Sequence, residues 1–494
     1  MEWTRALRYK KFDQWSDTDK KKLLDQVAQS PWRLSYHVQP ESGLLNDPNG
    51  FCYFNNQWHL FYQWYPMGPV HGLKCWYHVT SNDLIHWQNE GPALLPGNPY
   101  DSHGCYSGSA LPVGDRLFMM YTGNVRDENW QRSAYQLGAW MDTDNQIEKI
   151  KEPLIASVDQ PCTEHFRDPQ IISIDKMYYA LIGAQNKQLQ GQIYVYTSPD
   201  LQHWTFIGPL SISDAPFGYM IECPNLAFVD DKPVLIFCPQ GASKDLLAYD
   251  NIYPNAYITA DAFQPSDPRL VNPSRPANLD DGFDFYAAQA FNAPDGRTLM
   301  IGWVGLPEID YPTDRYGWAH CLSLVRELTW ADDGRLCQNP VQETETLRGA
   351  RQLGNGQLLQ SAARLLTASD ASYEFIIRLS GDSRTRLSLC SDGHQSLDLV
   401  IDFHAGLLVL DRTRAGIAFA ESYGTTRTVQ LQPEQPVELR IFIDQSVAEI
   451  YINHGRSVMT ARFFPSDAQR SIDLETAGHL DYTYEYWQLQ TSKG

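Results

Sequence analysis

Short runs of hydrophobic residues alternate with polar residues along most of this 494-residue chain, in the way that is typical of β-strands. A helical pattern is clear near the N-terminus, where residues 18–28 (TDKKKLLDQVA) place Leu23, Leu24 and Val27 on one face. Farther along, aromatic and β-branched runs are broken by Gly, Pro, Asn and Asp, as strands separated by turns would be. The pattern predicts an all-β protein with a helical extension over residues 1–30.

One strand pattern recurs five times. Each copy has a polar opening, an apolar strand, a tight turn and a second apolar strand, and the copies lie roughly 60 residues apart. The five openings are at Asp47, Cys105, Asp168, Glu222 and Asp284. Repeats of this length with about four strands each are typical of propeller blades. Residues 31–335 are therefore predicted to be a five-bladed β-propeller, because a β-sandwich of similar strand content would leave the period unexplained.

A shorter motif repeats inside this region. SNDLIHW at residues 81–87 returns as SPDLQHW at residues 198–204, about two periods later. Because His86 and His203 belong to this repeated motif, we interpret them as structural parts of the blades and not as catalytic residues.

The pattern changes beyond residue 335. Residues 336–360 are polar and contain glycine, and we interpret them as a linker. Over residues 361–494, alternating strands such as YEFIIRLS and VELRIFI resume without the blade pattern. This block is predicted to be a β-sandwich that packs against the propeller or a neighbouring subunit, with sugar binding as the alternative role.

Charge and composition exclude several classes of partner. The formal net charge is −20 and the sequence pI is about 5.0, so nucleic acid and anionic membrane surfaces would be repelled. The nine cysteines include no CxxC pair, so neither a disulfide framework nor a structural zinc site is indicated. No apolar signal sequence and no run of about 18 apolar residues occurs. We expect a soluble cytoplasmic protein with no metal and no cofactor, and the sequence leaves open whether it forms a homo-oligomer.

Asp47, Asp168 and Glu222 all stand at the opening of a repeat. The innermost strands of propeller blades line one channel, so equivalent positions should converge near one axis. An isolated NDPNG cluster would ordinarily be only a turn, but the repeat places Asp47 with the other two acids. Carboxyl groups brought together have pKa values that separate, and two of them flanking a glycosidic bond suffice for its hydrolysis. Aromatic residues make up 12% of the chain, which suits sugar stacking and an aromatic β-rich core equally.

Five short motifs follow one another along the chain: LLNDPNG (44–50), FYQ (61–63), YSGS (106–109), FRDP (166–169) and ECP (222–224). Each motif alone is weak, but their order and spacing are specific. Together they resemble glycoside hydrolase family 32, the invertases and fructan hydrolases. The resemblance runs from residue 37 onward and includes DQSVAEIYINHGRSVMTARFFP at 444–465 in the predicted sandwich.

The resemblance implies a retaining mechanism. In this mechanism Asp47 is the nucleophile that forms a fructosyl-enzyme ester, and Glu222 is the general acid and then the general base. Asp168 is implied to stabilise the transition state by holding fructose hydroxyls, with Arg167 lowering its pKa by charge pairing. The positions that the resemblance implies around the fructose are Leu44, Leu45, Asn46, Gln63, His71, Trp76, Tyr106, Ser107, Arg167 and Trp303.

Several positions depart from the common pattern of the family and leave the three acids unchanged. Leu44 and Leu45 stand where many members have Trp-Met, and Tyr106 replaces a frequent Phe. His71 and Tyr77 stand where Trp and Gly are common. These differences affect the expected substrate preference and not the reaction class. HGLKCWYHVTS and GLLNDPNG are most similar to the intracellular bacterial branch of the family, which acts on sucrose 6-phosphate.

The implied activity is hydrolysis of terminal β-D-fructofuranosides, with sucrose 6-phosphate and sucrose as the expected substrates. The alternatives are a β-fructosidase of fructo-oligosaccharides, a fructosyltransferase with the same covalent intermediate, a non-catalytic sugar-binding propeller, and a five-bladed family that cleaves arabinose or xylose linkages. A substrate phosphate would need local cations near the pocket rim. Lys74 is our candidate for that contact, with an ordinary solvated lysine as the alternative. A small sugar is the expected partner, without nucleic acid or membrane.

Overall fold

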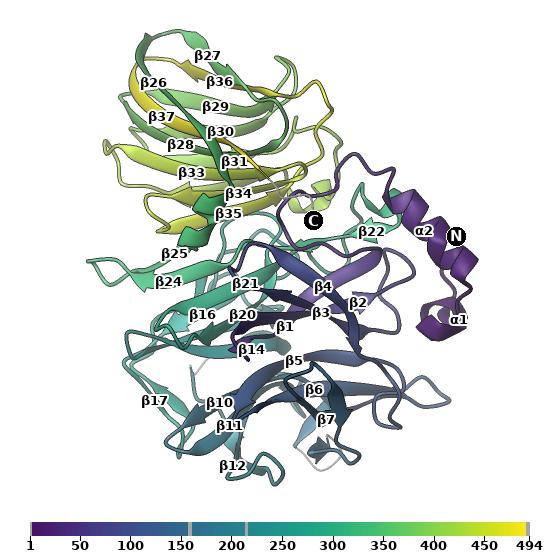
Figure 1. Ribbon diagram of the computed structural model, residues 1–494. Helices are drawn as coiled ribbons and strands as arrows, with labels where there is room; N and C mark the ends of the chain where they lie inside the picture. Colours follow the sequence, from purple (N-terminus) through teal and green to yellow (C-terminus); the bar gives the residue numbers. More distant parts are fainter. Residues whose placement is uncertain (1, 157–160, 213–215, 491–494) are drawn as a thin grey trace.

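The computed structural model describes residues 2–156, 161–212 and 216–490, and most of them lie in strands and the turns between strands (Figure 1). The prediction of an all-β protein is confirmed. The helical elements before the first strand are α1 (Arg5–Arg8), η1 (Phe12–Gln14) and α2 (Asp17–Val27). The Ser16 hydroxyl caps α2 by accepting a hydrogen bond from the backbone N–H of Asp19 at 3.1 Å. Within the described ranges, no helix is long and apolar enough to cross a bilayer.

Five antiparallel sheets of four main strands follow one another between residues 43 and 340, which we call the five-sheet part. The first holds β1 (Gly43–Phe54), β2 (Gln57–Tyr65), β3 (Cys75–Ser81) and β4 (Trp87–Leu94), with β22 (Trp318–Ala319) beside β1. The second holds β5 (Cys105–Val113), β6 (Arg116–Arg126), β7 (Arg132–Met141) and β8 (Ile147–Lys149), with β9 (Ile155–Ala156) beside β7. The third holds β10 (Cys162–Ile174), β11 (Met177–Asn186), β12 (Gly191–Ser198) and β13 (Thr205–Pro209).

The fourth sheet holds β14 (Met220–Val229), β15 (Lys232–Gln240), β16 (Ala256–Thr259) and β19 (Ala277–Asn278). The fifth holds β20 (Tyr286–Asn292), β21 (Thr298–Val304), β24 (Arg326–Trp330) and β25 (Leu336–Pro340), with β23 (Cys321–Leu322) beside β21. A separate hairpin pairs β17 (Ala262–Gln264) with β18 (Arg269–Val271), and η3 spans Asp314–Tyr316. Each first strand contacts the first strand of the next sheet, and β20 contacts β1, so the five first strands close a ring of contacts.

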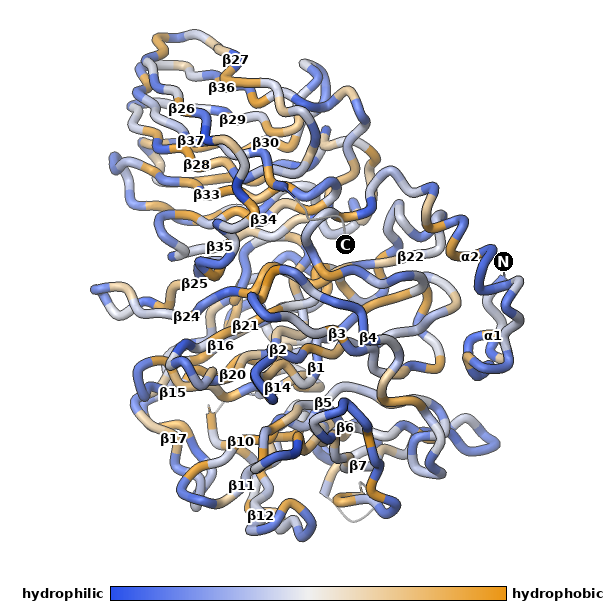
Figure 2. Tube along the Cα trace, in the orientation of Figure 1, coloured by the Kyte–Doolittle hydropathy of each residue, from blue (hydrophilic) through white to orange (hydrophobic). Residues whose placement is uncertain are grey.

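The core of the five-sheet part lies between neighbouring sheets. Strand β2, QWHLFYQWY, is buried at every position except its first, because both of its faces are covered. Phe61 and Trp76 of the first sheet share one hydrophobic cluster with Met119 and Tyr121 of the second. Figure 2 shows hydrophobic residues along these strands and hydrophilic residues on the loops and the N-terminal helices.

Two six-stranded sheets lie within residues 348–489, which we call the two-sheet part. One sheet has the order β26 (Arg348–Leu359), β37 (His479–Leu489), β28 (Ser372–Gly381), β33 (Val437–Asp444), β34 (Val447–Ile452) and β35 (Ser457–Arg462). The other has the order β27 (Ala362–Thr367), β36 (Ser471–Thr476), β29 (Arg384–Ser391), β30 (Leu397–Asp402), β31 (Leu407–Asp411) and β32 (Thr426–Gln430), and η5 spans Glu421–Tyr423. Phe375 and Ile441 of the first sheet and Leu387 and Leu399 of the second belong to one buried cluster.

The predicted linker at residues 336–360 is instead structured. It consists of β25, the 3-10 helix η4 (Gln342–Leu347) and the edge strand β26. Strand β26 is exposed at most of its positions and pairs on one side with β37. A strand exposed in this way needs few apolar residues, so its polar composition resembled that of a linker.

Buried charges join the two parts of the molecule. The guanidinium of Arg326 on β24 lies 2.8 Å from the carboxylate of Glu449 on β34, and neither side chain is exposed. The imidazole of His37 bridges the same carboxylate, at 3.0 Å, and that of Asp444, at 2.9 Å. The four residues come from three segments of the chain that are more than a hundred residues apart. The network therefore links strands that are far apart in the sequence.

All nine cysteines are buried. Cys390 lies on β29 in the two-sheet part, and the other eight lie before residue 340. Burial raises the pKa of the Cys390 thiol to about 11.

Candidate active site

A cavity of about 200 Å³ opens beside the ring of first strands, and all three predicted acids line it. Asp47 lies on β1, Asp168 on β10 and Glu222 on β14, so three different sheets each supply one carboxylate. The convergence that the repeats predicted therefore occurs.

A shared irregularity of the first strands accompanies this convergence. The register of β1 against β2 shifts between Leu45 and Pro48, and that of β10 against β11 shifts between Arg167 and Gln170. Strand β14 shifts directly after Glu222. Strands β5 and β20 have the same kind of shift near their beginnings. A bulge re-aims side chains and ends regular pairing, so the repeated bulge turns these positions toward the cavity.

Neutral donors surround the carboxylate of Asp47. The Asn46 amide donates to Oδ1 at 2.9 Å, and the Gln63 amide donates to Oδ2 at 3.4 Å. The Ser107 hydroxyl also donates to Oδ2. Lys74 donates to the amide oxygen of Asn46, which leaves the Asn46 amino group directed at Asp47. These contacts fix the orientation of a carboxylate that still faces the cavity.

Asp168 is held in an unusual backbone conformation. Its φ is 65°, in the left-handed region that Asp and Asn tolerate better than most residues. Its N–H donates to the Thr122 hydroxyl at 3.0 Å, and its Oδ2 accepts from the N–H of Cys223 at 3.1 Å. Burial raises the pKa of Asp168 to about 7; the charge of Arg167 opposes this shift, and those of Glu222 and Asp47 add to it. Arg167 is thus a counter-charge, as the resemblance implied, but burial outweighs it.

Glu222 accepts hydrogen bonds on both oxygens. Arg167 donates to Oε1 through Nη2 at 2.8 Å and through Nε at 3.1 Å. Gln240 and Tyr286 donate to Oε2 at 2.7 and 2.8 Å. Arg167 also lies 3.9 Å from Asp168, so one guanidinium links two of the three acids. Within the residues that the structure describes, no group of three or more His, Cys, Asp and Glu side chains could hold a metal ion.

Six of the ten other predicted pocket residues line the cavity. Those that line it are Asn46, Gln63, His71, Tyr106, Arg167 and Trp303. Ser107 is buried and contacts Asp47 directly. Leu44, Leu45 and Trp76 are core residues with at most 3% of their surface exposed. Both faces of β1 are covered by other elements, so the consecutive residues Leu44 and Leu45 are buried on opposite sides of the strand. The Trp76 indole donates a hydrogen bond to the Tyr106 carbonyl from behind the cavity.

Lys74 lies at the floor of the cavity and not at its rim. Only 4% of the residue is exposed, and its ammonium donates to Asn46 beside Asp47. Burial lowers the pKa of Lys74 to about 7, while the charges of Asp47 and Glu222 oppose the shift. The expectation that Lys74 serves a phosphate at the rim is therefore wrong about where the residue lies.

The cavity also has lining residues that the motifs did not indicate. Tyr286 and Gln240, which contact Glu222, lie on the fifth and fourth sheets. Tyr9 comes from the N-terminal extension, and Arg132 comes from the start of β7. In the register of the strands Tyr286, and not the predicted opening residue Asp284, stands where Glu222 stands, so aligning YAAQ with ECPN could have indicated it.

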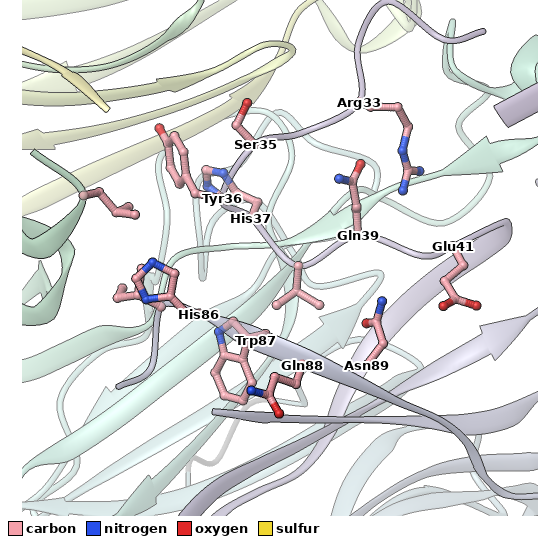
Figure 3. A pocket seen from close by; sticks show the side chains of 13 residues that line it. Arg33, Ser35, Tyr36, His37, Gln39, Glu41, His86, Trp87, Gln88 and Asn89 are labelled. Atoms are coloured by element: carbon pink, nitrogen blue, oxygen red, sulfur yellow. The ribbon is translucent and has the colours of Figure 1, made fainter. Parts of the chain in front are cut away.

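A larger cavity of about 390 Å³ lies between residues 33–41 and strand β4 (Figure 3). Its polar side chains include Arg33, Gln39, Glu41 and Asn89. None of the three acids lines it. The smaller cavity, which the three acids line, is therefore the candidate active site.

Comparison with known proteins agrees with this site. The model of the glycosyl hydrolases family 32 N-terminal domain matches residues 37–340, and that of the family 32 C-terminal domain matches residues 338–488. A sucrose-6-phosphate hydrolase from Pediococcus pentosaceus is 50% identical over 494 residues, which are 100% of this chain and 98% of that protein. One from Streptococcus mutans is 42% identical over 98% of this chain and 99% of that protein.

Solved structures resemble the chain over nearly its whole length. The structure of a sucrose-6-phosphate hydrolase from Lactobacillus gasseri superimposes with a TM-score of 0.94 at 43% identity, covering 99% of this chain and 100% of that one. A family 32 β-fructofuranosidase from Bombyx mori superimposes with a TM-score of 0.80 at 28% identity, covering 97% and 99% of the two chains. With both family models matched in order and three carboxylates gathered in one cavity, this chain belongs to glycosyl hydrolase family 32.

Proposed function

We propose that this glycosidase is a retaining β-fructofuranosidase that cleaves sucrose 6-phosphate, and also sucrose, to fructose and the glucose moiety. The observation that carries the proposal is the convergence of Asp47, Asp168 and Glu222 from three sheets on one cavity. The relatives in Pediococcus and Streptococcus, which match nearly the full chain, carry the name sucrose-6-phosphate hydrolase and support the choice of substrate.

In the proposed mechanism the carboxylate of Asp47 attacks the anomeric carbon of the fructosyl unit. The bond between that carbon and the glycosidic oxygen breaks, and Glu222 gives its proton to the leaving oxygen. Glu222 then removes a proton from water, which attacks the fructosyl ester and releases Asp47. The hydrogen bonds from Asn46, Gln63 and Ser107 orient Asp47 for attack.

The neighbours of Glu222 suit an alternating acid and base. Arg167, Gln240 and Tyr286 can stabilise its carboxylate after the proton has left. Burial raises the pKa of Asp168 to about 7, and the charges of Glu222 and Asp47 add to the shift, so Asp168 can keep a proton near neutral pH. Asp168 is proposed to hold fructose hydroxyls as charge develops on the sugar ring.

We also propose that the five-sheet part is a five-bladed β-propeller and that the two-sheet part is a β-sandwich. The closed order of contacts among β1, β5, β10, β14 and β20 supports the propeller. The single core shared by two six-stranded sheets supports the sandwich. We propose that residues 1–30 are an N-terminal extension and that the propeller has approximately the bounds 31–335. The sandwich begins at β26 and not at residue 361.

Rates on sucrose, sucrose 6-phosphate, kestose and inulin, measured side by side, test the substrate. We expect the highest kcat/KM with sucrose 6-phosphate and free fructose as the main product. Faster hydrolysis of unphosphorylated fructo-oligosaccharides would contradict the proposal that sucrose 6-phosphate is the preferred substrate. Fructo-oligosaccharides as the main product at high sucrose would instead make the chain a fructosyltransferase.

Asp47→Asn and early product NMR test the mechanism. The variant should keep the fold and lose turnover, because the amide cannot form the fructosyl ester. The wild type should release β-fructose first, since two displacements retain configuration. The inverted anomer in the first seconds would exclude Asp47 as the nucleophile.

A further inference from the structure

Two neighbouring arginines lie beside the cavity, at what we call its rim: Arg132 lines the cavity, and Arg126 is the cross-strand neighbour of Arg132. Arg126 and Arg132 are directly paired across the β6–β7 hairpin. Like charges directly opposite each other in a sheet destabilise it. The Nε atom of each arginine is buried without a hydrogen-bond partner, and neither guanidinium forms an ion pair with any described residue. In a chain with a net charge of −20, such a pair indicates a place for an anion.

The acidic residues of the same hairpin do not serve as partners. Asp127, in the connecting turn, accepts a hydrogen bond from the N–H of Gln131 at 2.7 Å through its carboxylate. Arg126 donates one bond, to the carbonyl of Trp130 at 3.2 Å, and lies 5.7 Å from the centre of that indole ring. Arg132 lies 6.0 Å from the centre of the Tyr106 ring. Both guanidinium groups are thus placed by aromatic rings while most of their donors stay available.

The N-terminal extension completes this rim with Tyr9. The carbonyl of Arg8 accepts a hydrogen bond from the N–H of Leu73 at 2.7 Å, and the carbonyl of Leu7 accepts one from the Tyr65 hydroxyl at 3.1 Å. These bonds fix the chain directly before Tyr9. The Tyr9 ring packs edge-on against Trp130 at 5.0 Å, and its hydroxyl interacts with Tyr106. Burial, mainly, raises the pKa of Tyr9 to about 12, so the hydroxyl stays a neutral donor at physiological pH.

The rim lies on the side of the site where the leaving sugar must be. Glu222 has to stand next to the leaving oxygen, and Arg167 binds Glu222. Arg132 and Glu222 line the same cavity of about 200 Å³, so Arg132 is near the acid. A group attached to the leaving glucose can therefore meet Arg132 while the fructose occupies the floor between Asp47 and Asp168.

We propose that Arg132 and Arg126, with the hydroxyl of Tyr9, bind the phosphate of a phosphorylated leaving sugar. This inference rests on the proposed function, and it locates the residues that distinguish sucrose 6-phosphate from sucrose. A phosphate dianion accepts several hydrogen bonds at once, and guanidinium groups match it in geometry as well as charge. Binding also relieves the repulsion between the two arginines.

The test compares Arg132→Gln and Arg126→Gln with the control Arg116→Gln. Arg116 begins β6 on the same hairpin, is partly exposed, and pairs with Glu148 away from the cavity. The measured quantity is the ratio of kcat/KM for sucrose 6-phosphate to that for sucrose. We expect Arg132→Gln to lower this ratio on the order of 10- to 100-fold, as loss of a charged hydrogen bond should. Arg126→Gln should lower it less, and Arg116→Gln should keep it within about twofold of the wild type.

A second readout uses the phosphorylated product as the probe. Glucose 6-phosphate should inhibit sucrose cleavage by the wild type more strongly than glucose does, and Arg132→Gln should abolish the difference. If Arg132→Gln does not fold, Tyr9→Phe and Arg132→Lys replace it, and both should lower the ratio by a smaller factor.

The outcomes separate the two proposals. A wild type that cleaves both sugars equally and is inhibited equally by glucose and its phosphate would overturn the proposed substrate. A wild type that prefers the phosphate, with a ratio unchanged in all of the rim variants, would place the phosphate elsewhere and overturn this inference alone.

Discussion

Asp168 is the most strained of the three acids. It combines a left-handed backbone with a carboxyl that is 6% exposed and lies near two other carboxyls. Such positions persist when the surrounding structure over-determines them, and here the Thr122 hydroxyl and the N–H of Cys223 do so. The carboxylate is therefore expected to serve binding and catalysis at the expense of stability.

The first prediction concerns Asp168→Asn. Between pH 3.8 and about 7 the folded protein binds a proton at Asp168 that the unfolded chain does not, so wild-type stability falls as pH rises through this range. Asparagine tolerates the same φ, can still accept from Cys223, and does not titrate. The variant should lose activity but exceed the wild type in Tm at pH 8, with the gain shrinking toward pH 4. Thermal unfolding at pH 4, 5.5 and 8 measures this difference. A variant less stable than wild type at pH 8 would mean that the Asp168–Arg167 pair stabilises the fold.

At the scale of elements, the repeated SNDLIHW and SPDLQHW motifs form the same turn twice. Asp83 accepts from the N–H of His86 at 2.8 Å, and Asp200 accepts from that of His203 at 2.9 Å. Each aspartate also meets the imidazole of its own histidine, at 2.6 and 2.8 Å. The residue after each aspartate, Leu84 or Leu201, has a φ near 65°. The structural interpretation of His86 and His203 therefore agrees with their contacts.

The second prediction concerns Asp83→Ala and Asp83→Asn. Alanine removes the carboxylate of Asp83, which accepts from the N–H groups of Ile85 and His86, and should lower the free energy of unfolding by about 1 kcal/mol. Asparagine keeps one acceptor and should lower it less. Burial opposes ionisation of Asp83, but its hydrogen bond with His86 prevails and lowers its pKa, so its contribution should be lost as pH falls through the folded-state pKa. Urea unfolding of both variants at pH 7 checks the order. Equal losses would show that the imidazole contact, and not the backbone hydrogen bonds, stabilises the turn.

The repeats made the acids predictable, because one position in each repeat becomes one position on the ring. The bulges that turn Asp47, Asp168 and Glu222 toward the cavity carry no apolar period, so the sequence indicated where the acids are and not how they point. Tyr9 lies in the N-terminal extension, and Arg132 begins β7, away from the opening positions that the repeats share, so only packing brings them to the cavity. Leu44 and Leu45 were wrongly predicted to line the pocket. The family motif gave their position along the strand but not the direction in which their side chains point.

At the scale of the whole molecule, the buried network of His37, Arg326, Asp444 and Glu449 fastens the two parts together. Burial opposes the charge of His37, yet its hydrogen bonds to Asp444 and Glu449 raise its pKa to about 9. Burial likewise opposes the charge of Glu449, yet Arg326 and His37 lower its pKa to about 2. The histidine contribution is complete below pH 6.5 and is lost as pH rises through about 9, whereas the glutamate contribution is lost as pH falls below 4.5.

The third prediction concerns Glu449→Ala. It leaves Arg326 and His37 buried without their shared partner, so the free energy of unfolding should fall by about 3–5 kcal/mol at pH 6. The loss should be smaller at pH 10, where His37 is neutral. Arg364→Ala is the matched control, because its pair with Asp473 is exposed and should contribute less than about 1 kcal/mol. Denaturant unfolding of both variants at the two pH values measures the losses, and similar losses in both would contradict the role assigned to the network.

Because all nine cysteines are buried, their reactivity toward a thiol reagent measures local unfolding of the molecule. A thiol reagent added in a short pulse can modify only those copies in which a strand has separated from its neighbours. Labelling of Cys390 detects unfolding of the two-sheet part, and labelling of the other eight detects unfolding of the five-sheet part. The masses of the labelled peptides therefore show when each part unfolds, independently of the other. Storage losses of this enzyme could then be traced to the half of the chain that fails first, without any mutation or dye.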